Sequence, residues 1–125
     1  MLTTYAKVMG IILVAIGILG FIPGIAPDGM LFGIFMVNAW HNIVHLFSGA
    51  VFLAVAFSDN WELTRKVVLA FAIIYGLVTI LGFFTPDGGL VLGMRDNMAD
   101  DILHLAITAS ALLIALPQRR PTLMR

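Results

Sequence analysis

Four long apolar stretches dominate the pattern of hydrophobic and polar positions along the chain. They cover residues 5–22, 39–57, 67–84 and 98–116; the first and third connecting segments contain Pro-Asp-Gly, and the central one is short and polar. An α-helix needs about 20 mostly apolar residues to cross a bilayer, with a range of about 17–25. The stretches are continuously apolar, whereas the strands of a membrane barrel are shorter and alternate between apolar and polar residues. The pattern therefore predicts an all-α fold, an integral membrane bundle of four helices.

The composition supports this prediction. Hydrophobic residues make up 61% of the 125 residues and charged residues only 11%, whereas a soluble domain has about 45–50% and about 25%. A domain this small has too large a surface for its volume to hide such an excess from water. The chain has no cysteine, and seven basic residues balance seven acidic ones, which excludes a disulfide-stabilised mini-protein and a basic nucleic-acid-binding face. We therefore expect the protein to lie in a lipid bilayer and not to bind nucleic acid.

The distribution of charge predicts an orientation. If all four stretches cross the membrane, both termini and the central loop share one side, and that side carries six of the seven basic residues: Lys7, Arg65, Lys66, Arg119, Arg120 and Arg125. The other side carries only Arg95, near Asp28, Asp87 and Asp96. Because basic residues accumulate in cytoplasmic loops, we expect a multi-pass membrane protein with both termini in the cytoplasm.

The chain also resembles itself after a shift of 59 residues. Fourteen of the 52 pairs that join residues 7–58 to residues 66–117 are identical. The matches include a Pro-Asp-Gly turn at Pro27 and Pro86, the pair Asn38 and Asn97, and the pair His45 and His104. Two repeats with two spans each have the same orientation, and such repeats are related by an axis along the membrane normal. The sequence predicts two parallel duplicated helical hairpins, at about residues 5–58 and 64–117, in a single domain of residues 1–125.

Polar residues gather where the second and fourth spans begin. The segments there are Asn38-Ala-Trp-His41-Asn42-Ile-Val-His45 and Asn97-Met-Ala-Asp100-Asp101-Ile-Leu-His104. The two Asn residues are expected N-caps. Residues three and four apart share a helix face, so His41 lies on one stripe with His45, and Asp100 on another with His104. Ionisable groups that face lipid are costly, and we expect both stripes to turn inward, with His45 and His104 approaching each other.

Three hypotheses explain this polar region. In the first, it is a structural hydrogen-bond network that pairs His41 or His45 with Asp100 or Asp101. In the second, it binds a ligand: a divalent zinc, copper or iron ion, a haem b with His45 and His104 as its two axial ligands, or a chlorophyll-type pigment held by each of these two residues. A proton or ion path is the third, and it is the least supported because the stripes become apolar towards the cytoplasmic side. The candidate metal ligands are His41, His45, Asp100 and His104, and the candidate structural cluster is Asn38, Asn42, Asn97 and Asp101.

The polar box at the start of the second span carries a resemblance to a known family. The run His41-Asn42-Ile-Val-His45-Leu46, with its partial echo Asp100-Asp101-Ile-Leu-His104-Leu105, resembles the small bacterial four-helix membrane proteins catalogued as domain of unknown function 4383. The resemblance covers nearly the whole chain. It implies a fold and a membrane location, but no activity and no cofactor.

Catalytic motifs give no indication of an enzyme. The chain has no Ser/His/Asp arrangement, no phosphate-binding loop and no nucleotide fingerprint. We therefore expect a non-enzymatic membrane protein, an accessory subunit or scaffold in a larger membrane complex or homo-oligomer, with an outward-facing His/Asp/Asn cluster. The alternative is a membrane protein that binds haem, a chlorophyll-type pigment or a divalent metal through His45 and His104.

Overall fold

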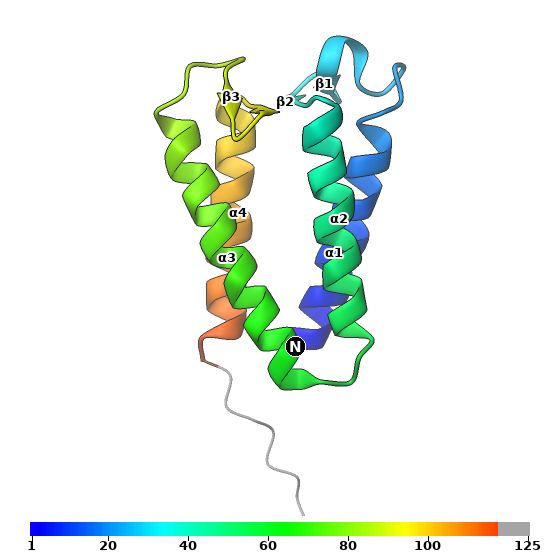
Figure 1. Ribbon diagram of the computed structural model, residues 1–125, viewed down its shortest axis with the longest axis vertical. Helices are drawn as coiled ribbons and strands as arrows, with labels where there is room; N and C mark the ends of the chain where they lie inside the picture. Colours follow the sequence, from blue (N-terminus) through cyan, green and yellow to red (C-terminus); the bar gives the residue numbers. More distant parts are fainter. Residues whose placement is uncertain (118–125) are drawn as a thin grey trace, which may run out of the picture.

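The computed structural model describes residues 1–117 and contains the same order of elements twice: a helix, a short two-stranded ribbon and a second helix (Figure 1). The elements are α1 (Leu2–Leu19), the 3-10 turn η1 (Pro27–Gly29), β1 (Met30–Leu31), β2 (Phe35–Met36), α2 (Ala39–Ala56), α3 (Trp61–Phe83), β3 (Leu90–Val91), β4 (Met94–Arg95) and α4 (Met98–Ala115). The four predicted helices are confirmed, and the fold of the described residues is dominated by them.

The helix ends show how local chemistry fixes boundaries. Helices α2 and α4 begin at the predicted residues because Asn38 and Asn97 cap them. Helix α3 begins six residues before its predicted start, since the side chain of Asn60 accepts a hydrogen bond from Leu63 N. The first turns of α3 therefore contain Arg65 and its neighbour Lys66, which the sequence analysis had placed in a loop. Helix α1 lies three residues closer to the N-terminus than predicted.

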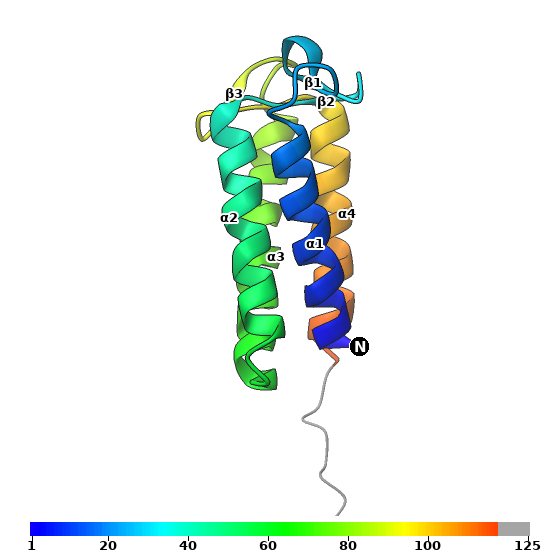
Figure 2. The ribbon, with the colours of Figure 1, turned by 90° about the vertical axis from the view of Figure 1, so that its right-hand side faces the viewer.

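The helices form two hairpins that stand side by side (Figures 1 and 2). Helix α1 packs chiefly against α2, and α3 packs chiefly against α4, while the hairpins meet over a narrower surface. The shared core is built from side chains such as Leu13, Phe52, Val68 and Ala111, all at most 1% exposed. The ribbons lie at one end of the bundle, the ribbon end, and the α2–α3 connection lies at the other, the loop end.

The ribbons were not predicted. From the sequence, the apolar segments of residues 30–37 and 89–94 are too short to span and are expected at the outer interface or over the mouth of the bundle. The structure pairs β1 with β2 and β3 with β4 in antiparallel register there. The β3–β4 turn is made by Leu92 (φ 50°) and Gly93 (φ 83°), the positive angles of a tight hairpin turn. Leu31 and Val91 are each 2% exposed, so each ribbon closes the ribbon end of the bundle with an apolar side chain.

The outward faces of all four helices are apolar. Ile11, Phe47, Ile73 and Leu113, one from each helix, are 61%, 68%, 63% and 75% exposed. Soluble monomers rarely expose apolar patches that continue around the molecule. All four helices are long and apolar enough to cross a membrane, which makes the fold compatible with a multi-pass membrane protein.

Candidate functional site

The first turns of α2 and α4 are fixed to each other by two asparagines. Asn38 and Asn97 each accept a hydrogen bond from the backbone N–H three residues further on, at 2.9 and 3.1 Å. Each also donates through Nδ2 to the ribbon of the other hairpin: Asn38 to the carbonyl of Gly93 and Asn97 to the carbonyl of Ile34, both at 2.9 Å. The residues that start the helices therefore also set the position of one hairpin against the other.

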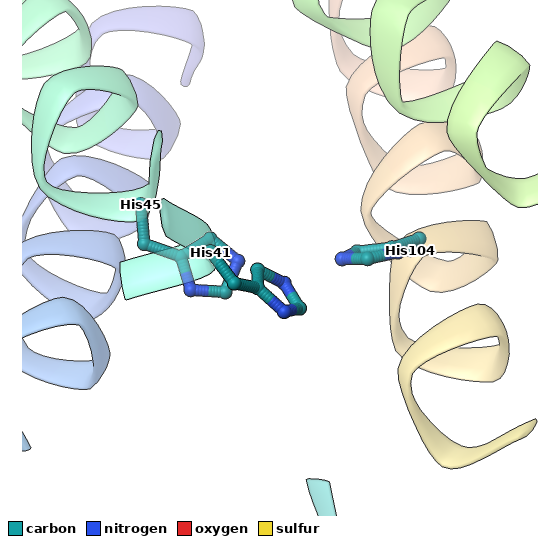
Figure 3. A group of neighbouring side chains, drawn as sticks. All are labelled: His41, His45 and His104. Atoms are coloured by element: carbon teal, nitrogen blue, oxygen red, sulfur yellow. The ribbon is translucent and has the colours of Figure 1, made fainter. Parts of the chain in front are cut away.

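Three imidazole rings converge directly below this junction (Figure 3). His41 and His45 come from α2 and His104 comes from α4, with ring centroids 4.5 Å (His41–His45), 5.9 Å (His41–His104) and 6.4 Å (His45–His104) apart. The three residues are 1%, 5% and 3% exposed. The prediction that His45 and His104 turn inward and approach each other is confirmed.

The ring nitrogens of these histidines are poorly satisfied. His41 Nδ1 lies 2.9 Å from the carbonyl oxygen of Arg95 and 3.2 Å from that of Met36, so it carries the proton and donates. His41 Nε2 is then a free lone pair, and it has no partner among the described residues, nor has Nδ1 of His45 or of His104. Buried polar atoms are almost always hydrogen-bonded, and three unpartnered nitrogens in one place call for an explanation.

The spacing of the three histidines suits a metal ion. One ligand atom from each lies within 4.8 Å of the others. At the corners of a triangle of that size they would stand about 2.8 Å from its centre, against about 2.0–2.1 Å for a zinc–nitrogen bond. Small side-chain rotations close such a difference. The contact from His41 Nδ1 to backbone carbonyls is also the kind that orients a metal-binding imidazole.

A second group of potential ligands shares His104. Asp96 and Asp101 place carboxylate oxygens within 4.8 Å of each other and of that imidazole. Asp96, just before the α4 cap, is 3% exposed, and burial raises its pKa to about 7, helped by the negative charges of Asp101 and Asp100. From the sequence, Asp96 is placed among the charges of the outer side and is an alternative to Asn97 as the N-cap of the fourth helix, a position that Asn97 occupies. The counterpart of Asp96 after the 59-residue shift is Val37, an apolar residue, and that match was the available indication that the position is buried.

Asp100 has a different role from the one predicted. Its Oδ2 accepts hydrogen bonds from Met36 N at 2.9 Å and from Asn97 N at 3.1 Å, which completes a capping box at the start of α4. Asp100 belongs to neither group of potential metal ligands. Within residues 1–117, no ion pair joins His41 or His45 to a carboxylate, so the predicted pairing of these histidines with Asp100 or Asp101 is wrong. The physical reason is the position of Asp100 in the first helical turn, where free backbone N–H groups compete for its oxygens.

The other two members of the predicted structural cluster pack against glycines. Asn42 and Asp101 are each 2% exposed, and a Cβ at Gly20 or Gly82 would collide with their side chains. The Oδ1 atoms of Asn42 and Asp101 have no hydrogen-bond partner among the described residues. Both side chains are packed closely inside their own hairpins, and Asp101 also shares a side-chain hydrogen bond with Asp96.

The three histidines line a cavity of about 180 Å³ between α2, α3 and the β3–β4 ribbon. Typical ligand pockets have volumes of about 300–1,000 Å³, so this cavity is smaller than a typical one. The ring of His41 lies closer to each of the other two rings than those two lie to each other. The cavity is too small to hold the macrocycle of haem b or of a chlorophyll-type pigment, whereas a single metal ion needs only the space between the three imidazoles.

The chain is therefore a small protein of four long apolar helices with polar groups buried at one end. Proteins of this class are suited to a bilayer. A family profile described as "Domain of unknown function (DUF4383)" matches residues 3–116. The chain belongs to this family, as its polar box suggested. No curated protein and no solved structure matches the chain.

Proposed function

We propose that this protein is a multi-pass protein of the bacterial inner membrane with both termini in the cytoplasm. The apolar exposed faces of all four helices support the membrane location. Lys7, Arg65 and Lys66 belong to the loop-end turns of their helices, and Arg95 belongs to β4 at the ribbon end. Three further basic residues of the predicted cytoplasmic side, Arg119, Arg120 and Arg125, lie outside the described residues.

Reporter fusions test this orientation. A reporter inserted after Asp28 should report the periplasm, and one at the C-terminus should report the cytoplasm, because an even number of spans separates the two termini and an odd number separates these two sites. If both fusions report the same compartment, the four-span topology is wrong.

The hairpins are proposed to be parallel duplicates. Helix α4 begins 59 residues after α2, and α3 begins 59 residues after α1. In an experimental structure, residues 7–57 should superpose on residues 66–116 after a rotation about the membrane normal. An inverted relation between the halves would contradict the duplication.

The function that the geometry supports best is binding of one divalent transition-metal ion by His41, His45 and His104. The observation that carries this proposal is the set of three buried ring nitrogens without partners. A network that only held the helices together would satisfy these atoms, since an unpaired buried polar group costs about 1–3 kcal/mol. One nitrogen of each ring lies within reach of a common metal ion, which would bind imidazole lone pairs at this buried place.

The chemistry of the donor set fits this role. Neutral imidazoles suit zinc, copper, iron and nickel, and the proton on His41 Nδ1 leaves Nε2 free to bind. Three protein ligands leave one tetrahedral position for water or another ligand. The carboxylates of Asp96 and Asp101 lie beside His104 and would place negative charge next to a dication.

Metal titration of the protein in mild detergent tests the proposal. After treatment with EDTA, the protein should bind one Co²⁺ per chain with a visible absorption band, and Zn²⁺ should displace it. His41→Gln, His45→Gln and His104→Gln should each abolish stoichiometric binding, because a carboxamide is a poor ligand for these metals. Asp100→Asn is the matched control: it changes a buried polar residue of the same region and should leave binding intact.

The opposite result would favour the scaffold hypothesis. If Co²⁺ and Zn²⁺ do not bind, and each His→Gln change is mild because an amide still donates and accepts hydrogen bonds, the cluster is structural. The protein would then be an accessory subunit of a larger membrane complex or of a homo-oligomer.

A further inference from the structure

The cavity next to the histidines has features that a metal ion does not use. Besides the three imidazoles, it is lined by aromatic and aliphatic side chains of α2, α3 and the β3–β4 ribbon, namely Trp40, Val44, Phe71, Ile74, Tyr75, Val78, Leu92 and Met94, and by Ser48. Trp40, Ile74 and Leu92 are 52%, 50% and 68% exposed. The mouth of the cavity is therefore apolar and opens between α2 and α3, on the face that we propose lies against lipid.

The inner wall carries a hydroxyl without a partner. Tyr75 is 6% exposed, and its OH makes no hydrogen bond among the described residues. The ring of Tyr75 lies 5.4 Å from that of His104 and 6.3 Å from that of Phe71. Ser48 lies close to this OH. A buried tyrosine normally finds a partner for its OH, and an acceptor that enters the cavity could take that place beside Ser48.

The equivalent place on the other side of the bundle is nearly closed. A cavity of only about 30 Å³ lies there, lined by Ile16, Phe35, His45 and Leu103 among others. After the 59-residue shift, Ile16 is the counterpart of Tyr75, and Ile107 is the counterpart of Ser48. The side of the bundle with the larger cavity therefore also carries the hydroxyl groups of Tyr75 and Ser48. The other side has a smaller cavity and isoleucines at the equivalent positions. Imperfect packing between hairpins would explain the space but not the hydroxyls.

We propose that this cavity binds the head ring of a quinone-type lipid that enters from the bilayer between α2 and α3. A cavity of about 150 Å³ holds benzene, so about 180 Å³ accepts one six-membered ring, whose substituents extend into the open mouth of the cavity. The aromatic and aliphatic walls suit a flat apolar ring. Tyr75 OH donates to a ring carbonyl, and the lipid tail leaves through the apolar mouth beside Ile74.

The proposal rests on the proposed membrane setting but not on metal binding. The test therefore uses EDTA-treated protein in detergent. The probe is duroquinone, a tetramethyl benzoquinone, and the comparison compound is durene, which has the same ring and methyl groups without the carbonyl oxygens. In a Trp61→Phe background, Trp40 at the cavity wall is the remaining tryptophan, and quenching of its fluorescence reports binding.

Duroquinone should quench Trp40 with a saturable curve, and durene should displace it poorly. Tyr75→Phe should weaken binding about tenfold through loss of one hydrogen bond, and Ser48→Ile, which copies Ile107, should abolish binding by filling the cavity. The matched control is Tyr5→Phe, because Tyr5 OH bonds Ser110 Oγ at 2.9 Å outside the cavity and its loss should leave binding unchanged. Circular dichroism shows that each variant keeps its helices.

Two results would overturn the proposal. The first is quenching that never saturates, which indicates partition into the detergent. The second is equal binding of duroquinone and durene with no effect of Tyr75→Phe, which makes the cavity apolar packing space. The experiment also separates the two proposals. If the protein binds duroquinone saturably but does not bind Co²⁺, the quinone proposal is supported and the metal proposal fails.

Discussion

The two hairpins have the same order of elements, but their helices approach each other differently. In the first hairpin, α1 and α2 touch through their backbones at Gly10 and Gly49: a Cβ on Gly49 would lie 2.8 Å from the carbonyl oxygen of Gly10. The positions 59 residues further on are Leu69 and Thr108. In the second hairpin, a Cβ on Gly76 would meet its nearest neighbour, Thr108 Cγ2, at 3.4 Å, an ordinary contact. The first hairpin is held by backbone proximity, whereas the second is held by side chains.

The two hairpins also contribute different polar side chains to the ribbon end of the bundle. His41, Asn42 and Val37 of the first half correspond to Asp100, Asp101 and Asp96 of the second half. Among the grouped side chains, the first half supplies two imidazoles and the second supplies one imidazole with carboxylates. The comparison teaches that two hairpins with the same order of elements can present different polar side chains to the one interface between them.

The largest effect should come from the glycine contact of the first hairpin. Gly49→Ala should destabilise the protein by about 3 kcal/mol, since the new methyl group meets backbone atoms that cannot move aside cheaply. Thermal unfolding in detergent measures the change. The control is Gly76→Ala in the second hairpin, which should stay within about 0.5 kcal/mol. If the two changes lower the free energy of unfolding by the same amount, the helices of the two hairpins do not differ in how they are held together.

An intermediate effect is expected from the capping asparagines. Asn38→Ala and Asn97→Ala should each cost about 2 kcal/mol: about 1 for the lost cap and about 1 for the lost hydrogen bond to the opposite ribbon. Because the two residues make equivalent bonds, their effects on the unfolding free energy should agree. Asn60→Ala is the control, since Asn60 only caps α3 and should cost about half as much. If Asn38→Ala and Asn97→Ala change the free energy of unfolding by very different amounts, the two asparagines do not contribute equally to the contact between the hairpins.

The smallest effect concerns a bond that only one half makes. Trp40 Nε1 donates to the carbonyl of Leu92 at 3.2 Å, and the counterpart of Trp40 is Ala99. Trp40→Phe should cost about 0.5–1 kcal/mol, because the ring stays and one partly exposed hydrogen bond is lost. Chemical unfolding with and without the change measures this cost. A loss above about 3 kcal/mol would mean that Trp40 supports the ribbon through more than this bond.

Much of the fold could be predicted from local information in the sequence. Span length and continuous apolarity predict the four helices, and the capping chemistry of Asn38 and Asn97 predicts where two of them begin. The cost of an unpaired ionisable group predicts that His45 and His104 turn inward. These features depend on residues close together in the chain, and for that reason periodicity and residue type were sufficient.

The errors arose where backbone groups from distant segments compete for a side chain. Asp100 has the right type and spacing for a metal ligand, but Met36 N, 64 residues away, uses its carboxylate. The ribbon turns place Phe32 and Leu92 at φ values of 56° and 50°, which such residues seldom adopt and which no local rule predicts. Both side chains are more than half exposed, so the tight turns of the two ribbons, and not burial, account for these conformations.

The sequence by itself determined the helices, their caps, the repeat of 59 residues and the set of polar groups available at one end, because each depends on composition and short-range spacing. Only the tertiary structure decided which of those groups meet. The cross-hairpin hydrogen bonds of Asn38 and Asn97 set the distance between α2 and α4. That distance brings His104 to His41 and His45, assigns Asp100 to the backbone, and leaves the cavity beside Tyr75, since contacts between chain segments about 60 residues apart depend on how the two hairpins pack.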